Sequence, residues 1–438
     1  MPNTIIKTSR HEILPYANTG KIESLHSFID EYRRVASIIV NEIWNNGVSW
    51  ADKNKESKRF SIKDNLLEFP MFLDYNSFDI GDTFLSARSL SSLVTQISGI
   101  IRASTEKQRK RLFMLDKNKS NGVPKKKMEK LIKKIKTNIP QKPNCERINV
   151  ELSSKCSDWE DDDNKEFIGF IRLKSITKDR TQFNIPIKGH KHSKKLSKKG
   201  VRKNSFLISK DCINVRWEIE KPDLRTEGEI VGCDQGMKDV LTCSNKMITP
   251  KVNVHGHSLE SILKKMTKKK KGSKAFARTQ KQRTNFINWS INQLNMDDFK
   301  EVRLERIFNI GFKSKQSSLL SHWTNTTIRD KIESKCEEEG IRLIHQSSTY
   351  RSQRCSCCGV VRKSNRKGKN YSCKHCGNEI DADLNASLNH VVDLPEIPYT
   401  LRKMNLNRGN GFYWIESGFY DFSSGRSLES LLPVEDPL

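Results

Sequence analysis

The sequence predicts a multidomain α+β protein in which a helical lobe interrupts a β-domain and an α/β domain follows. The chain has 438 residues, which exceeds the roughly 250–300 residues that a single hydrophobic core usually supports. Apolar residues recur with helical spacing in the first part of the chain, and after Pro143 the period changes to two. A cluster of cysteines between Cys355 and Cys376 adds a small metal-binding module within the last part.

The charge of the chain indicates a polyanionic partner. There are 79 Lys and Arg against 52 Asp and Glu, and the formal net charge is +27. This balance is unusual for a metabolic enzyme and is typical of nucleic-acid binding. No apolar run is long enough for a membrane span, and Met1 to Arg10 lack the hydrophobic core of a signal peptide. We therefore expect no membrane partner and an intracellular protein: cytoplasmic and nucleoid-associated if prokaryotic or phage-encoded, nuclear if eukaryotic.

Two long helical stretches are predicted near the N-terminus. Between Ile22 and Trp44 the apolar residues fall three or four apart, which places them on one helical face. Leu85 to Ile101 continues the helical character, and Glu106 to Lys136 is strongly basic. A basic run of this kind is either a solvated helical face or a phosphate-binding surface, and the net charge favours the second. The phosphate-binding candidates here are Arg109, Lys110, Arg111, Lys125, Lys126 and Lys127.

Strands are predicted where apolar and polar residues alternate. This holds for 148–152, 167–176 and 213–219. Short strand signals near Ile5 and Ile13 suggest that the helical stretch is an insertion in a β-domain that begins at the N-terminus. A basic segment from Lys188 to Lys203 is predicted to be a loop that grips a nucleic-acid backbone. Its candidates are Lys194, Lys195, Lys198, Lys199 and Arg202; His190 and His192 are a metal-site alternative without further ligands at suitable spacing.

Four cysteines have the spacing of a structural zinc site. Cys355 and Cys358 form one C-x2-C pair, and Cys373 and Cys376 form another. Four thiolates close the tetrahedral shell of Zn²⁺ and leave no position for catalysis. Cys357 and His375 lie inside the pairs and are alternative ligands that the spacing disfavours. The loop between the pairs carries the nucleic-acid-binding candidates Arg362 and Lys363, with a merely solubilising loop as the alternative.

Three carboxylates are candidates for a catalytic metal site. Asp234 ends a predicted strand before Gly236, Glu305 lies at the end of a second, and Asp383 precedes a predicted helix. Taken singly, Asp234 and Glu305 are consistent with ordinary turn residues, and Asp383 with a helix cap, a role that Asp381 can also fill. Clustered carboxylates from separate elements are what two-metal phosphodiester hydrolysis requires, and Mg²⁺ prefers such oxygen ligands. In a chain this basic, they predict a Mg²⁺-dependent nuclease.

The order of these motifs resembles the split RuvC nuclease of the TnpB family. The motifs are 230–236 (IVGCDQG), 304–307 (LERI), 352–355 (SQRC) at the start of the cysteine cluster, and 381–386 (DADLNA). The family includes transposon-encoded TnpB, the eukaryotic Fanzor proteins and the compact type V CRISPR effectors. The resemblance covers roughly residues 228–390.

The resemblance implies an RNA-guided DNA endonuclease whose partners are a guide RNA and a target DNA. It implies a helical recognition lobe inserted in a β-barrel wedge domain, then an RNase H-like RuvC domain with an inserted zinc ribbon. Asp234, Glu305 and Asp383 take the catalytic, Mg²⁺-binding positions, and the four cysteines take the Zn²⁺ positions. A basic segment between the first two RuvC motifs adds the nucleic-acid-binding candidates Lys268, Lys269 and Arg283.

The expected domain boundaries follow from the same comparison. They are the first part of the wedge domain at 1–20, the helical lobe at 21–140, the second part of the wedge domain at 141–226, RuvC motifs one and two at 227–350, the zinc ribbon at 351–379, RuvC motif three at 380–392, and a docked tail at 393–438.

The chain departs from the family pattern at three points. Gln235 replaces a frequent aliphatic residue, Arg306 follows Glu305 where an acidic residue is common, and Glu301 is a competing acidic residue upstream. Two other functions remain open: a guided DNA-binding repressor that does not cut, and an unguided zinc-ribbon RNA-binding protein. The first is disfavoured because all three carboxylate positions are filled.

Overall fold

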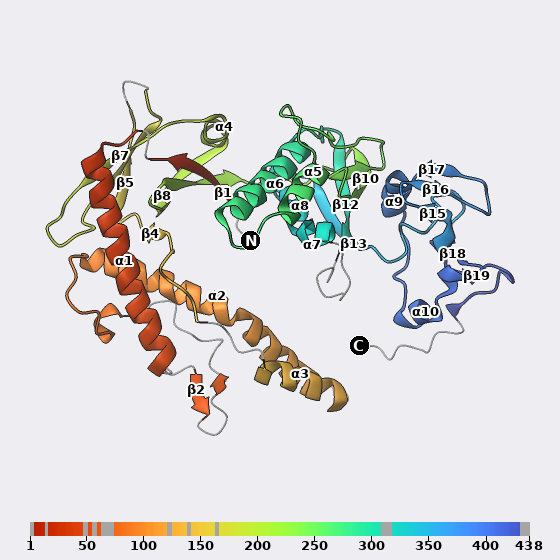
Figure 1. The fold of residues 1–438 in the computed structure, drawn as a ribbon, viewed down its shortest axis with the longest axis horizontal. Coiled ribbons are helices and arrows are strands. Elements are labelled where there is room, and N and C mark those ends of the chain that lie inside the picture. Colours follow the sequence, from red (N-terminus) through yellow and green to blue (C-terminus); the bar gives the residue numbers. More distant parts are fainter. Residues whose placement is uncertain are drawn as a thin grey trace. The chain divides into compact units, whose positions relative to one another are not determined.

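The computed structural model combines helices and β-sheets in two compact units, Met1–Glu220 and Lys221–Leu438 (Figure 1). It describes residues 4–13, 16–46, 51–54, 59–62, 74–120, 125–137, 142–162, 166–307 and 318–429. Each unit is described separately below. No helix within these ranges has the length and apolar character needed to cross a membrane.

The first unit is built on a sheet whose strands come from both sides of a helical insertion. Its elements are β1 (Thr4–Glu12), α1 (Thr19–Asn46), β2 (Ala51–Asn54), β3 (Arg59–Ile62), α2 (Ala87–Ser120), α3 (Lys125–Thr137), β4 (Val150–Leu152), β5 (Ser157–Glu160), β6 (Gly169–Leu173), β7 (Phe183–Ile187), α4 (Lys191–Lys199), β8 (Gly200–Ile208) and β9 (Cys212–Glu220). Strand β1 pairs antiparallel with β9 along its whole length. The first and last strands of the unit are therefore neighbours, and α1 to α3 are inserted between strands of one sheet, as the short strand signals near Ile5 and Ile13 suggested.

Helix α1 buries the face that its apolar spacing predicted. Leu25, Ile29, Tyr32, Ile39 and Ile43 are all at most 1 % exposed. The Tyr32 hydroxyl donates to the side-chain oxygen of Gln96 on α2, 3.0 Å away, so this buried hydroxyl has a partner. The predicted helix at 22–44 is confirmed and extends slightly at both ends.

The expected closed barrel is wrong for the described strands. They form an open four-stranded sheet, β1-β9-β8-β4, and a separate three-stranded sheet, β5-β6-β7. The register of β8 on β9 shifts between Arg202 and Phe206, which interrupts the ladder. There the Ser157 hydroxyl of β5 donates to the carbonyl oxygen of Asn204, 3.0 Å away. At this point the two sheets are joined by a side chain and by shared apolar packing, so no continuous backbone ladder closes the barrel.

The basic segment predicted as a loop is a helix instead. Residues Lys191–Lys199 form α4, and the His190 side chain accepts a hydrogen bond from the Ser193 backbone N–H in a capping box. Leu196 is buried and anchors the helix. The prediction failed because one buried leucine among lysines gives no periodic signal, while the cap depends on an uncommon histidine.

The second unit contains a mixed sheet with the order β11-β10-β12-β13. Its elements are β10 (Glu229–Gln235), β11 (Leu241–Cys243), α5 (Leu259–Thr267), α6 (Lys274–Asn292), β12 (Phe299–Arg306), α7 (Ser318–His322), α8 (Asn325–Glu339), β13 (Arg342–Ser347), β14 (Val360–Val361), β15 (Arg366–Lys367), β16 (Asn370–Ser372), β17 (Glu379–Asp381), α9 (Ala382–Val391), α10 (Tyr399–Met404), β18 (Phe412–Ile415) and β19 (Gly418–Asp421). Strands β10, β12 and β13 are parallel and β11 is antiparallel to β10.

The two faces of this sheet are covered by different helices (Figure 1). Val231 and Cys233 of β10, and Val302 and Leu304 of β12, belong to the core that also contains apolar residues of α5, α6 and α8. Helix α9 packs against β10 from the opposite face, where Gly232 lies. Because side chains alternate along a strand, this second face receives the even-numbered residues of β10 and the odd-numbered residues of β12.

Gly232 allows α9 to approach the sheet closely. A Cβ atom at Gly232 would lie 2.1 Å from the carbonyl oxygen of Ser387 and 2.9 Å from the Cβ atom of His390. The first contact is with helix backbone, which a side-chain rotation cannot relieve. Glycine is therefore required here for the position of α9.

The end of the chain folds back on the cysteine-containing segment. Strand β18 pairs with both β14 and β19. Phe412, Trp414 and Phe419 are buried in a small core with Leu401 and Leu428. The aromatic residues of the tail therefore serve mainly in packing; 430–438 lie outside the described residues.

Replacing Gly232 with alanine is expected to destabilise the protein by about 1–3 kcal/mol, because the methyl group displaces α9. Gly99→Ala is the control, since a Cβ at this position in α2 meets nothing within 4 Å and alanine favours a helix. Thermal unfolding measures both. A Gly232→Ala protein with the unfolding midpoint of the unsubstituted chain would contradict the packing of α9 described above.

Candidate active site and cysteine cluster

Strand geometry brings Asp234 and Glu305 together on the α9 face of the sheet. Cys233 and Leu304 are register partners on β10 and β12, so the residues that follow them, Asp234 and Glu305, are neighbours near the carboxyl ends of parallel strands. Both are 8 % exposed. Gln235 links the two strand ends: its backbone N–H donates to Glu305 Oε1 at 2.9 Å, and its side-chain amide donates to the Glu305 carbonyl oxygen at 3.1 Å. The unusual glutamine thus supports Glu305.

The electrostatics of this pair favour a cation. Burial raises the pKa of Asp234 well above its usual value, and repulsion by Glu305 and Asp383 raises it further. Burial also raises the pKa of Glu305 to about 7, although the Gln235 N–H stabilises its ionised form. Crowded, buried carboxylates with raised pKa values are typical of functional sites that bind a positive charge.

Asp383 joins the site from the first turn of α9. Asp381 is the helix cap, because its side chain accepts hydrogen bonds from the N–H groups of Asp383 and Leu384 at 2.9 and 3.1 Å. The Asp383 carboxylate is therefore free of the capping role. It accepts a hydrogen bond from Arg366 Nη2 at 3.0 Å and forms an ion pair with Lys369.

Lys369 connects Asp383 to a further carboxylate that the sequence did not single out. Its ammonium group lies 2.7 Å from Oδ2 of Asp239, which is 4 % exposed. Burial disfavours the charged ammonium, but the hydrogen bonds to Asp239 and Asp383 raise the pKa of Lys369. Lys369 is thus a fixed positive charge beside a candidate metal ligand.

His390 was also missed. Asp234, Glu305 and His390 each offer a ligand atom, and these atoms lie within 4.8 Å of one another. His390 is 1 % exposed, and burial lowers its pKa to about 3, so the ring is neutral. It follows Asp383 by two helical turns and faces the same sheet, a spacing that becomes informative only once the helix is known to pack there.

The competing acidic residue Glu301 is engaged elsewhere. Its carboxylate accepts from Arg303 Nε at 2.6 Å, and the same guanidinium contacts Asp393 at 2.6 Å. This pairing distinguishes Glu301 from Glu305, which has no ion pair with an arginine among the described residues.

The donor set fits divalent metal ions. The α9 residue in the group within 4.8 Å is His390, while the carboxylate of Asp383, the predicted third ligand, is outside this group but near enough to repel Asp234 and Glu305. Hard divalent cations prefer carboxylate oxygens. The buried negative charge of the three groups is offset in part by Arg366 and Lys369, so a bound cation has a clear electrostatic role.

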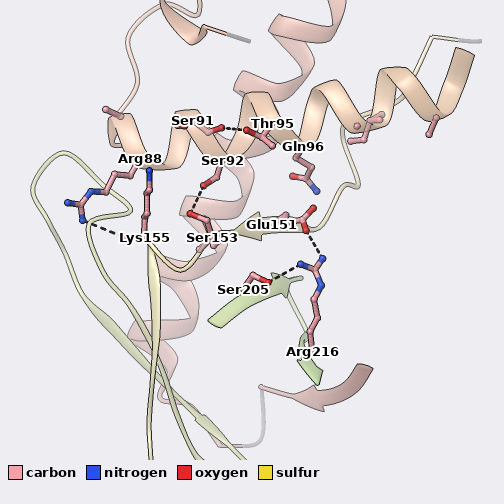
Figure 2. A pocket seen from close by; sticks show the side chains of 15 residues that line it. Arg88, Ser91, Ser92, Thr95, Gln96, Glu151, Ser153, Lys155, Ser205 and Arg216 are labelled. Atoms are coloured by element: carbon pink, nitrogen blue, oxygen red, sulfur yellow. Dashed lines mark hydrogen bonds and ion pairs between the residues drawn. The ribbon is translucent and has the colours of Figure 1, made fainter. Parts of the chain in front are cut away.

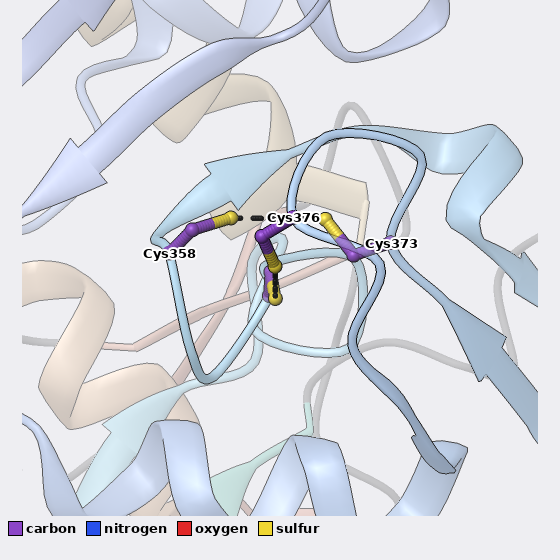
Figure 3. A group of neighbouring side chains, drawn as sticks. Cys358, Cys373 and Cys376 are labelled. Carbon is purple, nitrogen blue, oxygen red and sulfur yellow. Dashed lines mark hydrogen bonds between the residues drawn. The ribbon is translucent and has the colours of Figure 1, made fainter.

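The four predicted cysteines form one compact cluster (Figure 3). The Sγ atoms of Cys355 and Cys376 are 3.7 Å apart, as are those of Cys358 and Cys373. Four sulfurs around a zinc ion at 2.3 Å are separated by about 3.8 Å, so the cluster fits a tetrahedral ion. Burial opposes ionisation of Cys376, but hydrogen bonds, including one from the Asn378 backbone, lower its pKa to about 7.

The alternative cysteine-region ligands lie outside this cluster. Cys357 is exposed and is not among the four converging sulfurs. His375 Nε2 is 3.1 Å from the Tyr413 hydroxyl, so its ring contacts the tail.

Two asparagines of α9 attach the cysteine-containing segment to the sheet domain. Asn385 and Asn389 each donate to the Arg354 carbonyl oxygen at 2.8 Å, and Asn385 Oδ1 accepts from the Ser356 N–H. Both asparagines are fully buried. Asparagine is unfavourable inside a helix, so two asparagines one turn apart were a sequence signal for a buried hydrogen-bonding role.

The basic candidates of the first unit differ in exposure. Lys110 is exposed and Arg109 is half-buried, and both pair with Glu106. Arg202 stacks over the Trp159 ring at 4.2 Å and is partly desolvated. Arg111 donates to Gln108 at 2.9 Å. Exposed lysines are Lys125 on α3 and Lys194, Lys195, Lys198 and Lys199 on α4; the side chains of Lys126 and Lys127 lie outside the described residues.

The basic candidates of the second unit also divide into two groups. Lys268, Lys269 and Lys363 are exposed. Arg283 is 9 % exposed and bonds to the His322 carbonyl oxygen, and Arg362 stacks over Phe422 at 4.6 Å. The two arginines thus have structural contacts, and the three lysines present their charge to solvent.

A pocket of about 870 Å³, lined by polar and apolar groups, lies between α2 and β4 in the first unit (Figure 2). One wall is a face of α2 with small and hydroxyl side chains, including Ser91, Thr95 and Gly99. The other wall contains Arg216, which pairs with Glu151. In Figure 2, Ser92 and Gln96 of α2 point toward the strands that carry Glu151 and Arg216.

Residues 326–390 match the family model of the Cas12f1-like TNB domain. This segment contains α8, β13, the cysteine cluster and most of α9. The resemblance to the TnpB and compact type V superfamily, inferred from the order of motifs, is thereby confirmed in the C-terminal part of the chain.

The relatives with similar sequences are nucleases and a transposase by name. The chain is 37 % identical over 100 residues to the CRISPR-associated endodeoxyribonuclease Cas12f1 of Sulfoacidibacillus thermotolerans, covering 23 % of this chain and 21 % of that protein. It is 28 % identical over 94 residues to the putative transposase A625R of Paramecium bursaria Chlorella virus 1, covering 22 % of this chain and 21 % of that protein. The matches thus span about a fifth of these relatives.

Among solved structures, a Cas12f1–sgRNA–target DNA complex aligns with a TM-score of 0.41 and 15 % identity, covering 89 % of this chain and 99 % of that chain. The mini-RNA-guided endonuclease Cas phi3 aligns with a TM-score of 0.45 and 9 % identity, covering 90 % and 94 %.

Zinc content tests the cysteine cluster. Cys373→Ser removes one of four ligands and is expected to lower bound zinc at least about tenfold from one ion per chain. Cys357→Ser leaves the cluster intact and is expected to retain the ion. Elemental analysis of the purified proteins measures both. Equal loss of zinc in the two variants would contradict the assignment of the four ligands.

Replacing Lys369 with methionine is expected to strengthen divalent-metal binding roughly tenfold, or ~1.4 kcal/mol, because its ammonium competes with the metal for Asp383. Lys367→Met is the control, since Lys367 is exposed on the same hairpin. Calorimetric titration with Mn²⁺ measures both. Unchanged or weaker binding by Lys369→Met would show that Lys369 does not compete with the ion.

Proposed function

We propose that this protein is an RNA-guided DNA endonuclease that binds a structured guide RNA, recognises a short motif beside its target and cleaves the target DNA. The observation that carries the proposal is the pair of buried carboxylates Asp234 and Glu305 on adjacent strands, with Asp383 of α9 near enough to repel both. The motif order and the match to the Cas12f1-like TNB domain support it.

The catalytic chemistry follows from the charges at the site. Two Mg²⁺ ions, when bound, activate water and stabilise the leaving oxygen of a phosphodiester. Asp234 and Glu305 are held rigid by neighbouring parallel strands, and Asp383 by a capped helix, so the three carboxylates need little reorganisation to hold cations. Arg366 and Lys369 supply positive charge beside Asp383, where a phosphate would approach.

The cysteine cluster has a structural role in this proposal. A Zn²⁺ ion bound by the four thiolates would rigidify the hairpin β16–β17, and β17 leads directly into α9. The ion would thus hold Asp383 in place without taking part in cleavage.

The first unit offers surfaces for the nucleic acids. Its exposed lysines on α3 and α4 fit backbone contacts, whose strength falls with salt. The pocket between α2 and β4 combines hydroxyl and amide groups with Arg88, Lys155 and Arg216, a composition suited to the edges of base pairs and to phosphates. In this class of protein, guide pairing carries most of the sequence specificity.

The alternatives are a guided DNA-binding repressor and an unguided RNA-binding protein. The buried, mutually repelling carboxylates favour an enzyme, because retaining them without a metal costs stability. A repressor has no need for that arrangement.

The proposal is tested by sequencing the RNA that co-purifies with the protein expressed with its native flanking DNA. A single structured RNA ending in a discrete segment of about 16–20 nucleotides that can pair with DNA is expected. That segment defines a target for cleavage assays. Heterogeneous RNA would favour the unguided alternative.

Asp234→Ala is expected to slow Mg²⁺-dependent cleavage of that target by at least about 10³-fold while target binding persists, because metal stabilisation worth several kcal/mol is lost. Asp297→Ala, at an exposed turn outside the site, serves as the control. Gel-based cleavage and binding assays measure the two activities. Equal cutting by Asp234→Ala would exclude this site, and binding without cutting by the unsubstituted protein would favour the repressor.

A further inference from the structure

His390 lies at the centre of the candidate site but has no part in the function proposed above. A ring nitrogen of His390 and carboxylate oxygens of Asp234 and Glu305 lie within 4.8 Å of one another. The three residues come from α9, β10 and β12. Such convergence of a nitrogen ligand with two oxygen ligands is the arrangement of a mixed-donor metal site.

The position of His390 depends on the close approach of α9 to the sheet. His390 Cβ would lie 2.9 Å from a Cβ atom at Gly232, so the helix contacts the strand at the level of this residue. Asp383 and His390 are two helical turns apart and both are buried toward the sheet. The same helix therefore places the Asp383 carboxylate beside the site from its first turn and the His390 ring within it from its last.

A contact between the His390 ring and Gln346 indicates which ring nitrogen is available to a metal. His390 Nδ1 is 3.2 Å from Oε1 of Gln346, a carbonyl oxygen that only accepts hydrogen bonds. Nδ1 therefore carries the proton, and Nε2 keeps the lone pair that a metal requires. Gln346 is the register partner of Glu305 on β13, so it belongs to the same edge of the sheet. Metal-binding histidines are typically oriented by such a second hydrogen bond.

The donor set also indicates the kind of ion. Mg²⁺ prefers oxygen ligands and rarely takes imidazole, whereas Mn²⁺ and later divalent ions accept nitrogen readily. A site with one imidazole and two carboxylates should therefore discriminate in favour of Mn²⁺.

We propose that Asp234, Glu305 and His390 bind one divalent metal ion together, with His390 as a direct nitrogen ligand and with Mn²⁺ preferred over Mg²⁺. The inference deepens the metal centre of the proposed nuclease. It concerns metal binding alone, which is measurable without guide RNA or target DNA.

The test is pulsed electron paramagnetic resonance of the full-length, untagged protein with one equivalent of Mn²⁺ and no nucleic acid. A ¹⁴N coupling of directly bound imidazole is expected. Calorimetric titrations with Mn²⁺ and Mg²⁺ give the preference, and Mn²⁺ is expected to bind at least about tenfold more tightly.

His390→Leu is expected to remove the ¹⁴N coupling and to weaken Mn²⁺ binding at least about tenfold, with a smaller effect on Mg²⁺. His345→Leu is the matched control, because His345 is exposed on β13 next to Gln346. It is expected to change neither the coupling nor the affinity. Far-UV circular dichroism confirms that the variants are folded.

The absence of a ¹⁴N coupling in the unsubstituted protein with Mn²⁺ bound would overturn the inference, and this result does not depend on any variant being folded. A coupling that persists in folded His390→Leu would overturn it too. A coupling present in a protein that cuts no DNA would support the metal site and contradict the proposed function. Cleavage of target DNA by a protein that shows no ¹⁴N coupling would support the proposed function and contradict the metal site.

Discussion

The close contact between α9 and Gly232 is the constraint on which the candidate site depends. The Ser387 carbonyl oxygen lies where a side chain at position 232 would begin, so the helix reaches the sheet only because no side chain is there. This contact places Asp383 and His390 over the strand that carries Asp234. The carboxylates of β10 and β12 are adjacent through their register alone, but the groups of α9 reach them only through this packing.

The cysteine cluster and the carboxylate site are connected through β17 and α9. The cluster holds the hairpin β16–β17, and the chain passes from β17 into the Asp381 cap of α9 without a linker. The side chains of Asn385 and Asn389 on α9 donate hydrogen bonds to the carbonyl oxygen of Arg354. The cysteine cluster and the candidate carboxylate site are thus both attached to α9, and two cations of the cysteine-containing segment, Arg366 and Lys369, lie next to Asp383.

Many of the basic residues of the protein fall into two groups, arginines with structural contacts and lysines exposed to solvent. Several arginines are partly or fully desolvated and serve as structural groups: Arg202 stacks on Trp159, Arg283 bonds to a helix carbonyl, and Arg354 bridges the tail and α9. Exposed lysines on α3 and α4, and after α5, carry charge to solvent. This division agrees with the chemistry of the side chains, because guanidinium is less strongly hydrated and makes planar, multiple hydrogen bonds. Counting charges in the sequence does not separate the two groups.

The sequence by itself determined the elements whose signal is local. The periodic helix at 22–44 and the alternating strands follow from spacing, because side-chain direction repeats regularly along helices and strands. The four cysteines follow from their two C-x2-C pairs, and the three carboxylates from their places in motifs that resemble those of the TnpB family. Tertiary structure alone decided the rest. The open sheets, the capped helix at 191–199, the burial of Arg283, and the meeting of Lys369, Asp239 and His390 with the carboxylates depend on contacts between distant segments. These contacts depend on how distant elements pack, as in the approach of α9 to Gly232. Packing of this kind produces no periodic pattern in a single sequence.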